Sequence, residues 1–186
     1  MQEYCKQRSD YLKKVFLIMG ESGCGKTSIV EALEKRGFKS LQSYTTRKPR
    51  VDGETGHTFC SVKEYEQFKD NNEIVAYTYF DDNHYFCTKQ QLIDSDLYVI
   101  DPSGIKFLKE YVIDVEFITI YIQVREMDRI NRMYNRGETR ESISKRLQND
   151  NIKFKNKVFD YVVPNNNLKK TTDIIEYIML VEMDKF

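Results

Sequence analysis

The sequence has no excess of either charge and no long apolar run. Its 29 lysines and arginines balance 29 aspartates and glutamates, for a formal net charge of +0, which excludes a strongly cationic binder of nucleic acids or membrane surfaces. Apolar runs such as residues 15–19 (VFLIM) are far shorter than the roughly 20 residues that cross a bilayer. The polar N-terminus lacks the apolar stretch of a signal peptide. We therefore expect a cytoplasmic protein with no nucleic-acid and no membrane partner.

Cysteine, histidine, proline and glycine are scarce. The 4 cysteines (Cys5, Cys24, Cys60 and Cys87) include no C-x-x-C pair, and the 2 histidines do not complete a zinc site. A chain of 186 residues can bury a core without disulfides, which favours a reducing compartment. The 3 prolines and 8 glycines leave little room for a flexible linker, and the length fits one domain of roughly 100–200 residues.

Short apolar runs alternate with helical patterns along the chain. Residues 15–19, 97–100, 115–124 and 159–163 are typical of strands, the first of them buried on both faces. Apolar residues recur at helical spacing after these runs. This alternation predicts an α/β fold with a mostly parallel sheet flanked by helices.

Local signals predict three helix boundaries. Gly37 is a stop for the helix that follows the first strand. Ser103 would cap a helix that begins near Gly104, and Thr171 or Thr172 would cap the last helix.

Residues 41–96 do not follow this alternation. They contain short, polar, aromatic-rich pieces (HTFCSV, IVAYTYF and HYFCT) around Gly53 and Gly56. We interpret them as an antiparallel insertion on the main sheet, with its tyrosines forming a small core.

A glycine-rich loop follows the first strand directly. Residues 20–27, GESGCGKT, match G-x-x-x-x-G-K-[ST]. The glycines of this motif let successive backbone N–H groups point at a polyphosphate, and the following helix aims its positive end at the same anion. Lys26 can reach the β- and γ-phosphates, and the Thr27 hydroxyl can ligate Mg²⁺. A glycine-rich turn with an exposed lysine is the alternative, but the strand before the loop and the helix after it favour the phosphate site.

We therefore predict a site for ATP and Mg²⁺. The predicted ATP-binding residues are Gly20, Ser22, Gly23, Cys24, Gly25, Lys26, Thr27 and Ser28. Asp101 ends the second predicted strand, at the sheet edge where the loop lies, and is expected to orient Mg²⁺ or a substrate. Thr27 and Asp101 form the predicted metal set. A turn aspartate before Pro102 would have the same local sequence.

A second informative string is rich in hydroxyl groups and arginine. Residues 43–50 read SYTTRKPR, and Gly53 and Glu54 follow. Arginine presents planar donors that grip a phosphate through two hydrogen bonds. Alone the string could be a solvated basic loop, but after a phosphate loop it indicates a second phosphate site.

With both strings in view, the sequence resembles the guanylate kinase family. The S-x-T-T-R-x-P-R string followed by G-E is specific to that family, and the resemblance runs from the glycine loop nearly to the C-terminus. It implies a P-loop NTPase-type fold with a small antiparallel acceptor-binding insertion and a helical lid. It also implies transfer of the ATP γ-phosphoryl to GMP, giving ADP and GDP, with Mg²⁺. The expected division of a single guanylate kinase-like domain over residues 1–186 is a core of 1–40, 97–125 and 138–186, an acceptor-binding insertion of 41–96 and a lid of 126–137.

The resemblance assigns the acceptor phosphate to residues of the insertion. Ser43, Arg47 and Arg50 look like the family's binders of this phosphate. Tyr85 looks like the second tyrosine of the family's N-Y-Y-G string, and Asp101 matches the second aspartate of its D-x-D string. The predicted acceptor set is Ser43, Arg47, Arg50, Thr58, Tyr85 and Asp101.

The resemblance assigns transfer itself to Lys26 and to arginines of the lid. Arg132, Arg136 and Arg146 look like the lid and post-lid arginines that hold phosphates during transfer. Arg125 and Arg129 share one helix face with Arg132 and Arg136, because they are spaced by four, three and four residues. A solvated arginine face paired with neighbouring carboxylates is the alternative, which we favour more for Arg125 and Arg129. The predicted catalytic set is Lys26, Arg132, Arg136 and Arg146.

Several positions depart from the family pattern. Thr58 stands where the family has a tyrosine on the acceptor phosphate, and Ala76 stands where it has a glutamate for the guanine edge. Cys87 replaces a serine or threonine near the guanine oxygen, while Phe86 and Val99 replace a glycine and the first aspartate. A methyl group cannot accept from the adjacent N–H groups of guanine as a carboxylate does, and a thiol is a weak donor to the guanine oxygen, so we expect a looser or altered base preference.

Other carboxylates could replace the missing one if the register differs. The candidates are Glu73, Asp81 and Asp82.

The leading hypothesis is an ATP-dependent nucleoside monophosphate kinase that acts on GMP as a monomer or homodimer. One alternative keeps the fold and ATP but phosphorylates another nucleotide or a phosphorylated sugar. Another is a binding module without catalysis, although such modules typically lose the phosphate loop that is complete here.

Overall fold

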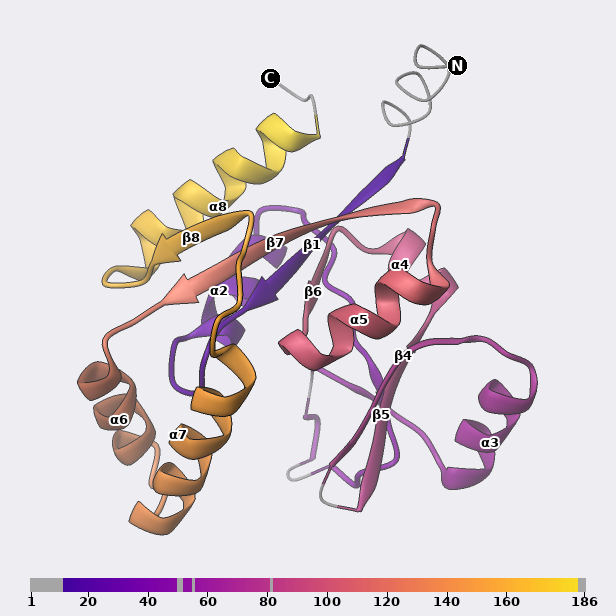
Figure 1. Ribbon diagram of the computed structural model, residues 1–186, viewed down its shortest axis with the longest axis horizontal. Coiled ribbons are helices and arrows are strands. Elements are labelled where there is room, and N and C mark those ends of the chain that lie inside the picture. Colours follow the sequence, from indigo (N-terminus) through magenta and orange to yellow (C-terminus); the bar gives the residue numbers. More distant parts are fainter. Residues whose placement is uncertain (1–11, 50–51, 55, 81, 184–186) are drawn as a thin grey trace. The chain divides into compact units, whose positions relative to one another are not determined.

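The computed structural model describes residues 12–49, 52–54, 56–80 and 82–183 (Figure 1). Its strands are β1 (Lys13–Met19), β2 (Tyr44–Thr45), β3 (Thr58–Phe59), β4 (Ile74–Phe80), β5 (Asn83–Thr88), β6 (Leu97–Val99), β7 (Val115–Gln123) and β8 (Tyr161–Pro164). Its helices are α2 (Lys26–Glu34), α3 (Val62–Asp70), α4 (Lys89–Asp94), α5 (Pro102–Tyr111), α6 (Glu126–Asn135), α7 (Arg140–Phe154) and α8 (Leu168–Glu182).

The predicted apolar runs build the first sheet, in the order β6-β1-β7-β8. Residues 15–19 of β1 are fully buried, as expected for a strand covered on both faces. β7 and β8 pair in parallel, with Ile120 opposite Tyr161, and the arrows of β1, β7 and β8 point the same way in Figure 1. The α/β fold class with a mostly parallel sheet is therefore confirmed.

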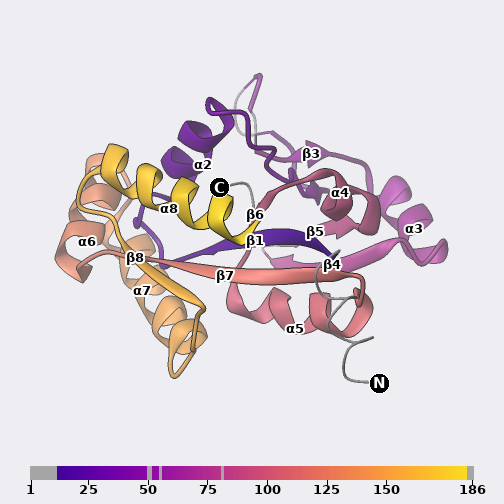
Figure 2. The ribbon, with the colours of Figure 1, turned by 90° about the horizontal axis from the view of Figure 1, so that it is seen from above.

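Helices α2 and α8 lie on the same face of β7 (Figure 2). The buried residues of α2 are Ile29, Val30 and Leu33, and the apolar residues that α8 buries are Ile175, Ile178 and Met179. Arg36, just beyond α2, forms ion pairs with Asp173 and Glu176 of α8. These contacts tie the helix that follows the glycine-rich loop to the C-terminal helix.

The second sheet is the predicted antiparallel insertion, with the order β3-β2-β5-β4. β2 and β4 both run antiparallel to β5, and only the short pair β2–β3 is parallel. Its aromatic residues form a small core with α3. His84 stacks on Tyr65, with 3.8 Å between the ring centroids, and lies 2.9 Å from the hydroxyl of Tyr77.

Two predicted helix caps are wrong. Helix α8 is capped by Asn167, so Thr171 and Thr172 lie within it, where their hydroxyls donate to the carbonyls of Asn167 and Leu168 at 2.9 and 2.8 Å. Asparagine and threonine are both good caps, and the local sequence did not separate them. Helix α5 begins at Pro102, so Ser103 lies in its first turn. Proline fits this first helical position because no intrahelical partner exists for its missing N–H.

The sequence patterns did not predict α3, α4 and α7. Helix α3 nevertheless carries a reciprocal capping box between Ser61 and Glu64, and Thr139 caps α7 through the N–H of Ser142. Around α3 and α4, the aromatic residues of the insertion had favoured strands. The caps of α3 and α7 are local signals, but apolar periodicity alone does not reveal them.

The described residues divide into two compact units. One contains residues 39–98 and 103–116 with the start of β1, and the other contains residues 16–38, 99–102 and the chain from 117 onward. The insertion sheet belongs to the first unit, whereas the glycine-rich loop, Asp101, α6 and α7 belong to the second. The predicted bounds of core, insertion and lid stay predictions. Within the described ranges, no helix has both the length and the apolar character needed to cross a membrane.

Candidate active site

The glycine-rich loop joins the end of β1 to the start of α2. Gly23 and Gly25 both have left-handed backbones, with φ of 79° and 95°. A Cβ on Gly23 would lie 2.7 Å from the carbonyl oxygen of Arg129, and one on Gly25 would lie 2.7 Å from the side-chain nitrogen of Asn165. Glycine is therefore required at both positions by conformation and by space.

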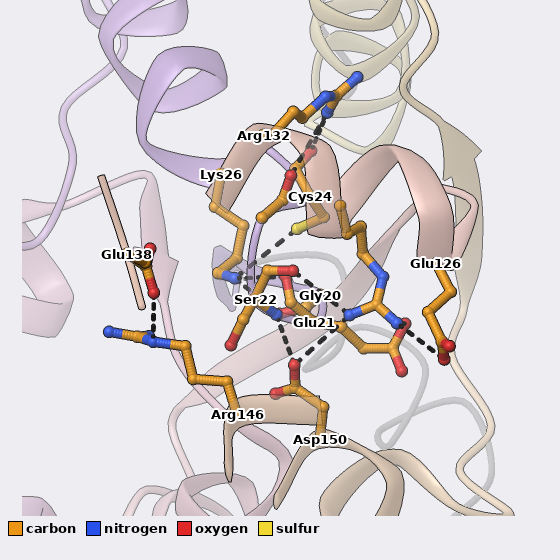
Figure 3. A network of polar contacts seen from close by, with 12 residues as sticks. Gly20, Glu21, Ser22, Cys24, Lys26, Glu126, Arg132, Glu138, Arg146 and Asp150 are labelled. Atoms are coloured by element: carbon orange, nitrogen blue, oxygen red, sulfur yellow. Dashed lines mark hydrogen bonds and ion pairs between the residues drawn. The ribbon is translucent and has the colours of Figure 1, made fainter. Parts of the chain in front are cut away.

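The ammonium group of Lys26 lies against the loop (Figure 3). Its Nζ donates to the carbonyl oxygens of Gly20 at 2.6 Å and Glu21 at 3.4 Å, and lies 3.6 Å from Sγ of Cys24. The first N–H groups of α2 have no acceptor within the helix. Together they concentrate positive charge at the loop, which is the arrangement that binds a polyphosphate.

A buried charge network links the loop to α6 and α7. The guanidinium of Arg129 is 3% exposed and lies 3.2 Å from Oε2 of Glu21 and 3.5 Å from Oδ2 of Asp150. Asp150 also accepts the backbone N–H of Ser22 at 2.8 Å (Figure 3). The hydroxyl of Tyr121 donates to Glu21 at 3.1 Å, and burial raises the pKa of this phenol, which keeps it a neutral donor. The alternative of a solvated face, which had more weight for Arg129 than for Arg132, is wrong for Arg129, because this side chain is a buried link.

Arg132 binds the loop through backbone carbonyl groups. Its Nη1 donates to Cys24 at 3.3 Å and Gly23 at 3.5 Å, and its Nη2 donates to the carbonyl of Asn165 at 3.0 Å. The side chain of Asn165 donates to the same Cys24 carbonyl at 2.8 Å. Arg132 also borders a polar cavity of about 440 Å³, lined by Arg125, Asp128, Asn131, Arg132, Asn135 and Asn166.

Arg136 and Arg146 meet on one carboxylate. Nη2 of Arg136 lies 2.8 Å from Oε1 of Glu138, and Nε of Arg146 lies 2.9 Å from Oε2. Both guanidinium groups are about half exposed. Glu138 thus brings the predicted lid arginine and the predicted post-lid arginine together.

Asp101 borders a second cavity together with the loop. This cavity of about 260 Å³ is lined by Gly20, Ser22, Lys26, Val99, Ile100, Asp101, Asp150, Lys153 and Phe154. Oδ2 of Asp101 lies 2.6 Å from Nζ of Lys153, while Thr27 is exposed at the start of α2. Among the described residues, no cluster of three or more His, Cys, Asp or Glu side chains could hold a metal ion.

The predicted acceptor residues gather in the other compact unit. Arg47 forms two hydrogen bonds to the carboxylate of Glu54, at 2.8 and 3.1 Å, and a further one to Tyr85. The bonds to Glu54 are the main cause of the raised pKa of Arg47. Oγ of the buried Ser43 lies 3.0 Å from Nδ1 of His57. The ring of His57 lies edge-on to that of Tyr85, with 5.6 Å between the centroids, so His57 belongs to the same cluster.

Thr58 does not join this cluster. It pairs with Tyr44, whereas Tyr85 pairs with Thr45, and neighbouring residues of a strand point to opposite faces. The Thr58 side chain is therefore on the far face from Tyr85, where its hydroxyl donates to the carbonyl of Gln42 at 3.4 Å. Arg50 lies outside the described residues.

The two positions that depart at the predicted base site lie directly opposite each other. Ala76 of β4 pairs with Cys87 of β5, and both are buried on the face that carries Tyr85. Burial raises the pKa of Cys87 to about 12, while a hydrogen bond with Tyr98 acts in the other direction. The thiol is thus neutral near pH 7 and is a weak donor.

Two of the alternative carboxylates form hydrogen bonds with nearby side chains. Glu73 precedes β4 and accepts from the side chain of Asn71 at 2.9 Å. Asp82 is exposed in the β4–β5 turn and accepts from Tyr79 at 3.3 Å. Asp81 lies outside the described residues.

The structure thus brings the loop, Arg132 and Asp101 together in one unit, and Ser43, Arg47 and Tyr85 in the other. Sequence reasoning missed Asn165, His57 and Asp150. Asn165 had a usable signal, because it follows a predicted strand as Asp101 does. His57 and Asp150 had none, because their partners lie 14 and 128 residues away along the chain.

Comparisons with known proteins converge on one family. The family model described as "Guanylate kinase" matches residues 12–182. The chain is 30% identical over 193 residues to a guanylate kinase of Bartonella henselae, covering 97% of this chain and 86% of that protein. It is 31% identical to a guanylate kinase of Mesomycoplasma hyopneumoniae (strain 7448), covering 94% of this chain and 98% of that protein. The crystal structure of guanylate kinase from Anaplasma phagocytophilum has the same fold, with a TM-score of 0.63 at 21% identity over 92% of this chain and 87% of that one.

Proposed function

Because this chain belongs to the guanylate kinase family, we propose that it is an enzyme that transfers the γ-phosphoryl group of ATP to GMP, giving ADP and GDP. The observation that carries the proposal is the complete phosphate loop at a strand–helix junction, with Lys26 held against it. Phosphoryl transfer requires positioning and charge stabilisation more than covalent chemistry. Both predicted phosphate sites contain lysine or arginine side chains, which can position phosphate groups and stabilise their charge.

On the donor side, the loop amides and Lys26 would bind the phosphates of ATP. Lys26 now donates to loop carbonyls, and phosphate oxygens would take over these donors with a stronger, charge-assisted bond. Arg132 supports the loop from its carbonyl side. Its neighbours Asn131, Asn135 and Asn166 supply amide donors and acceptors to the cavity of about 440 Å³, which suits the purine and ribose of the donor nucleotide.

Arg136 and Arg146 would bind phosphate oxygens as the lid helix closes. Their common partner Glu138 keeps the two guanidinium groups close to each other. A phosphate competes well for such partly exposed arginines, because exposed ion pairs are weak. We retain these arginines as the residues that neutralise charge during transfer.

The residues present fit Mg²⁺ as a cofactor. Thr27 offers a hydroxyl at the start of α2, and oxygen donors are what this ion prefers. No described cluster forms an all-protein site, which suits an ion held mainly by phosphates and water. When bound, the ion would neutralise charge on the phosphates. Asp101, the second residue of the predicted metal set, also has Lys153 as a partner.

On the acceptor side, Ser43, Arg47 and Tyr85 would bind the phosphate of GMP, and we add His57 to them. Arg47 is oriented by Glu54, which leaves its guanidinium plane fixed beside Tyr85. His57 touches both Ser43 and Tyr85, unlike Thr58. Arg50 stays a predicted member of this group.

The base site is apolar at Ala76 and Cys87. Guanine would find a methyl group in place of the family's carboxylate at Ala76, and a neutral thiol in place of a hydroxyl at Cys87. We therefore propose GMP as the acceptor with weaker discrimination against other bases than the about 10⁴-fold that a fully hydrogen-bonded site can reach.

A panel of acceptors tests the function. ADP formation from ATP would be followed with GMP, dGMP, AMP, UMP and ribose bisphosphate. The proposal expects GMP to have the highest kcat/KM, with AMP measurable. Family membership does not favour a sugar-phosphate kinase, and a preference for ribose bisphosphate would contradict the assignment. A chain that binds no ATP in calorimetry would instead be a binding module.

We also propose a cytoplasmic location, because ATP is the donor. We propose separately that the protein is a monomer or a homodimer.

A further inference from the structure

The last turn of α7 brings a lysine to the cavity beside the phosphate loop. Lys153 lines the cavity of about 260 Å³ together with Lys26 and Asp101, and its Nζ lies 2.6 Å from Oδ2 of Asp101. All residues of this lining belong to one compact unit. The cavity therefore has one ammonium group on the loop and another on α7.

Helix α7 is attached to the loop one turn before this lysine. Asp150 is 8% exposed and accepts the Ser22 N–H at 2.8 Å. Residues three apart lie on the same face of a helix, so Lys153 projects from the face that Asp150 anchors. The position of its ammonium relative to the loop is therefore set by a buried contact.

During the reaction, the negative charge of the transferred phosphoryl group must be neutralised. An oxygen of the acceptor phosphate forms a bond to the γ-phosphorus of ATP, while the bond from that phosphorus to the β–γ bridging oxygen breaks. The electron pair leaves with ADP, and no proton has to move. Charge is spread over the three equatorial oxygens, and fixed cations at those oxygens lower the barrier. Arg132 donates to loop carbonyls and lines the other cavity.

We propose that Lys153 is a catalytic residue that contacts the phosphoryl group during transfer, and that Asp101 is a positioning residue that holds its ammonium in the cavity. The proposal rests on the phosphotransfer function given above. Asp101 then acts through Lys153, and Mg²⁺ is left to Thr27 and the phosphates. The side chains of the pair are 41% and 29% exposed, so the pair contributes little to stability and its variants will fold.

The test compares Lys153→Met and Lys153→Arg with the wild type in a coupled assay of ADP formed from ATP and GMP. Lys153→Met keeps the side-chain length and removes the charge. We expect its kcat to fall by about 10²-fold, the scale of one preorganised electrostatic contact, with the KM of each substrate changed by less than about threefold. Lys153→Arg will retain more of the rate. Lys145→Met, at an exposed lysine of the same helix, will keep the wild-type kcat.

Asp101→Asn tests whether this carboxylate acts through Lys153 or through Mg²⁺. If it acts through Lys153, its loss of kcat will not multiply that of Lys153→Met in the double variant. The Mg²⁺ concentration for half-maximal rate will also stay at the wild-type value.

Three results would overturn the proposal. They are a kcat of Lys153→Met within about twofold of Lys145→Met, a raised KM at unchanged kcat, and losses that multiply in the double variant. A wild-type protein that forms no ADP with GMP contradicts the proposed function instead, before any variant is compared.

Discussion

Two cationic side chains at the phosphate loop, Arg129 and Lys26, differ in burial and therefore in role. Arg129 is 3% exposed and shares its charge with Glu21 and Asp150, so it cannot leave without stranding two carboxylates. Lys26 is part-buried and donates to backbone carbonyls, which a phosphate can replace. The first residue therefore holds the loop together, and the second is available to a substrate.

Replacing Lys26 with alanine tests the substrate-binding part of this distinction. The variant loses the ammonium that would lie on the β- and γ-phosphates, so we expect turnover to fall by at least ~10²-fold. Steady-state kinetics with ATP and GMP measures this loss. Lys35→Ala, at an exposed lysine just beyond α2, is the matched control and will keep its rate. Near-normal turnover of Lys26→Ala would count against the mechanism.

Replacing Arg129 with methionine tests the structural part. Methionine fills much of the volume but leaves the part-buried Glu21 and the buried Asp150 without their cation, so we expect the free energy of unfolding to fall by about 3 kcal/mol. Urea unfolding measures the loss. Arg140→Met, at the exposed start of α7, will change stability by less than about 0.5 kcal/mol. Equal stability of the two variants would mean that the network does not anchor the loop.

Among the helices, α2 and α8 are joined by ion pairs whose contribution depends on pH. Lys169 first and Arg36 second lower the pKa of Asp173, which lies in α8. The folded carboxylate thus binds its proton less tightly than in the unfolded chain. Its stabilising effect is present above the unfolded pKa of about 3.9 and is lost as pH falls through the lower folded pKa.

Asp173→Asn should therefore lower the thermal unfolding temperature at pH 7, and the difference from the wild type should shrink as pH falls below about 4. Scanning calorimetry at both pH values measures it. Asp70→Asn, at the exposed end of α3, serves as control. A difference that persists unchanged in acid would show that Asp173 acts by packing and not by its charge.

Across the whole chain, the two predicted phosphate sites belong to different compact units. One unit contains the contact between Gly20 and Lys26, and the other unit contains the cluster of Ser43, Arg47 and Tyr85. We therefore expect a non-hydrolysable ATP analogue to protect amides of residues 20–28 from hydrogen exchange, and GMP to protect residues 43–47 and 84–86. A bisubstrate compound that joins adenosine and guanosine through phosphates should protect both segments at once. Protection of only one segment by that compound would mean that the two sites do not serve one reaction.

The sequence alone was sufficient for the phosphate loop, the strands around it and the family resemblance. The loop is a contiguous motif whose glycines act through the local backbone and whose lysine and threonine act through side chains a few residues away. The strands β1 and β7 are apolar runs, and their burial follows directly from composition. Helices α3 and α4 were not predicted, because the aromatic residues near them favour strands as strongly as a helix core, and α7 was not predicted because its sequence has few apolar residues to show a helical period.

Long-range contacts required the tertiary structure. Asp150 reaches Ser22 across 128 residues, and Lys153 reaches Asp101 across 52. The sheet register separates Thr58 from Tyr85 and leaves His57 on Ser43, 14 residues away. No local periodicity encodes such pairs, because a side chain far along the chain becomes a neighbour only when the backbone has already been folded around a common core.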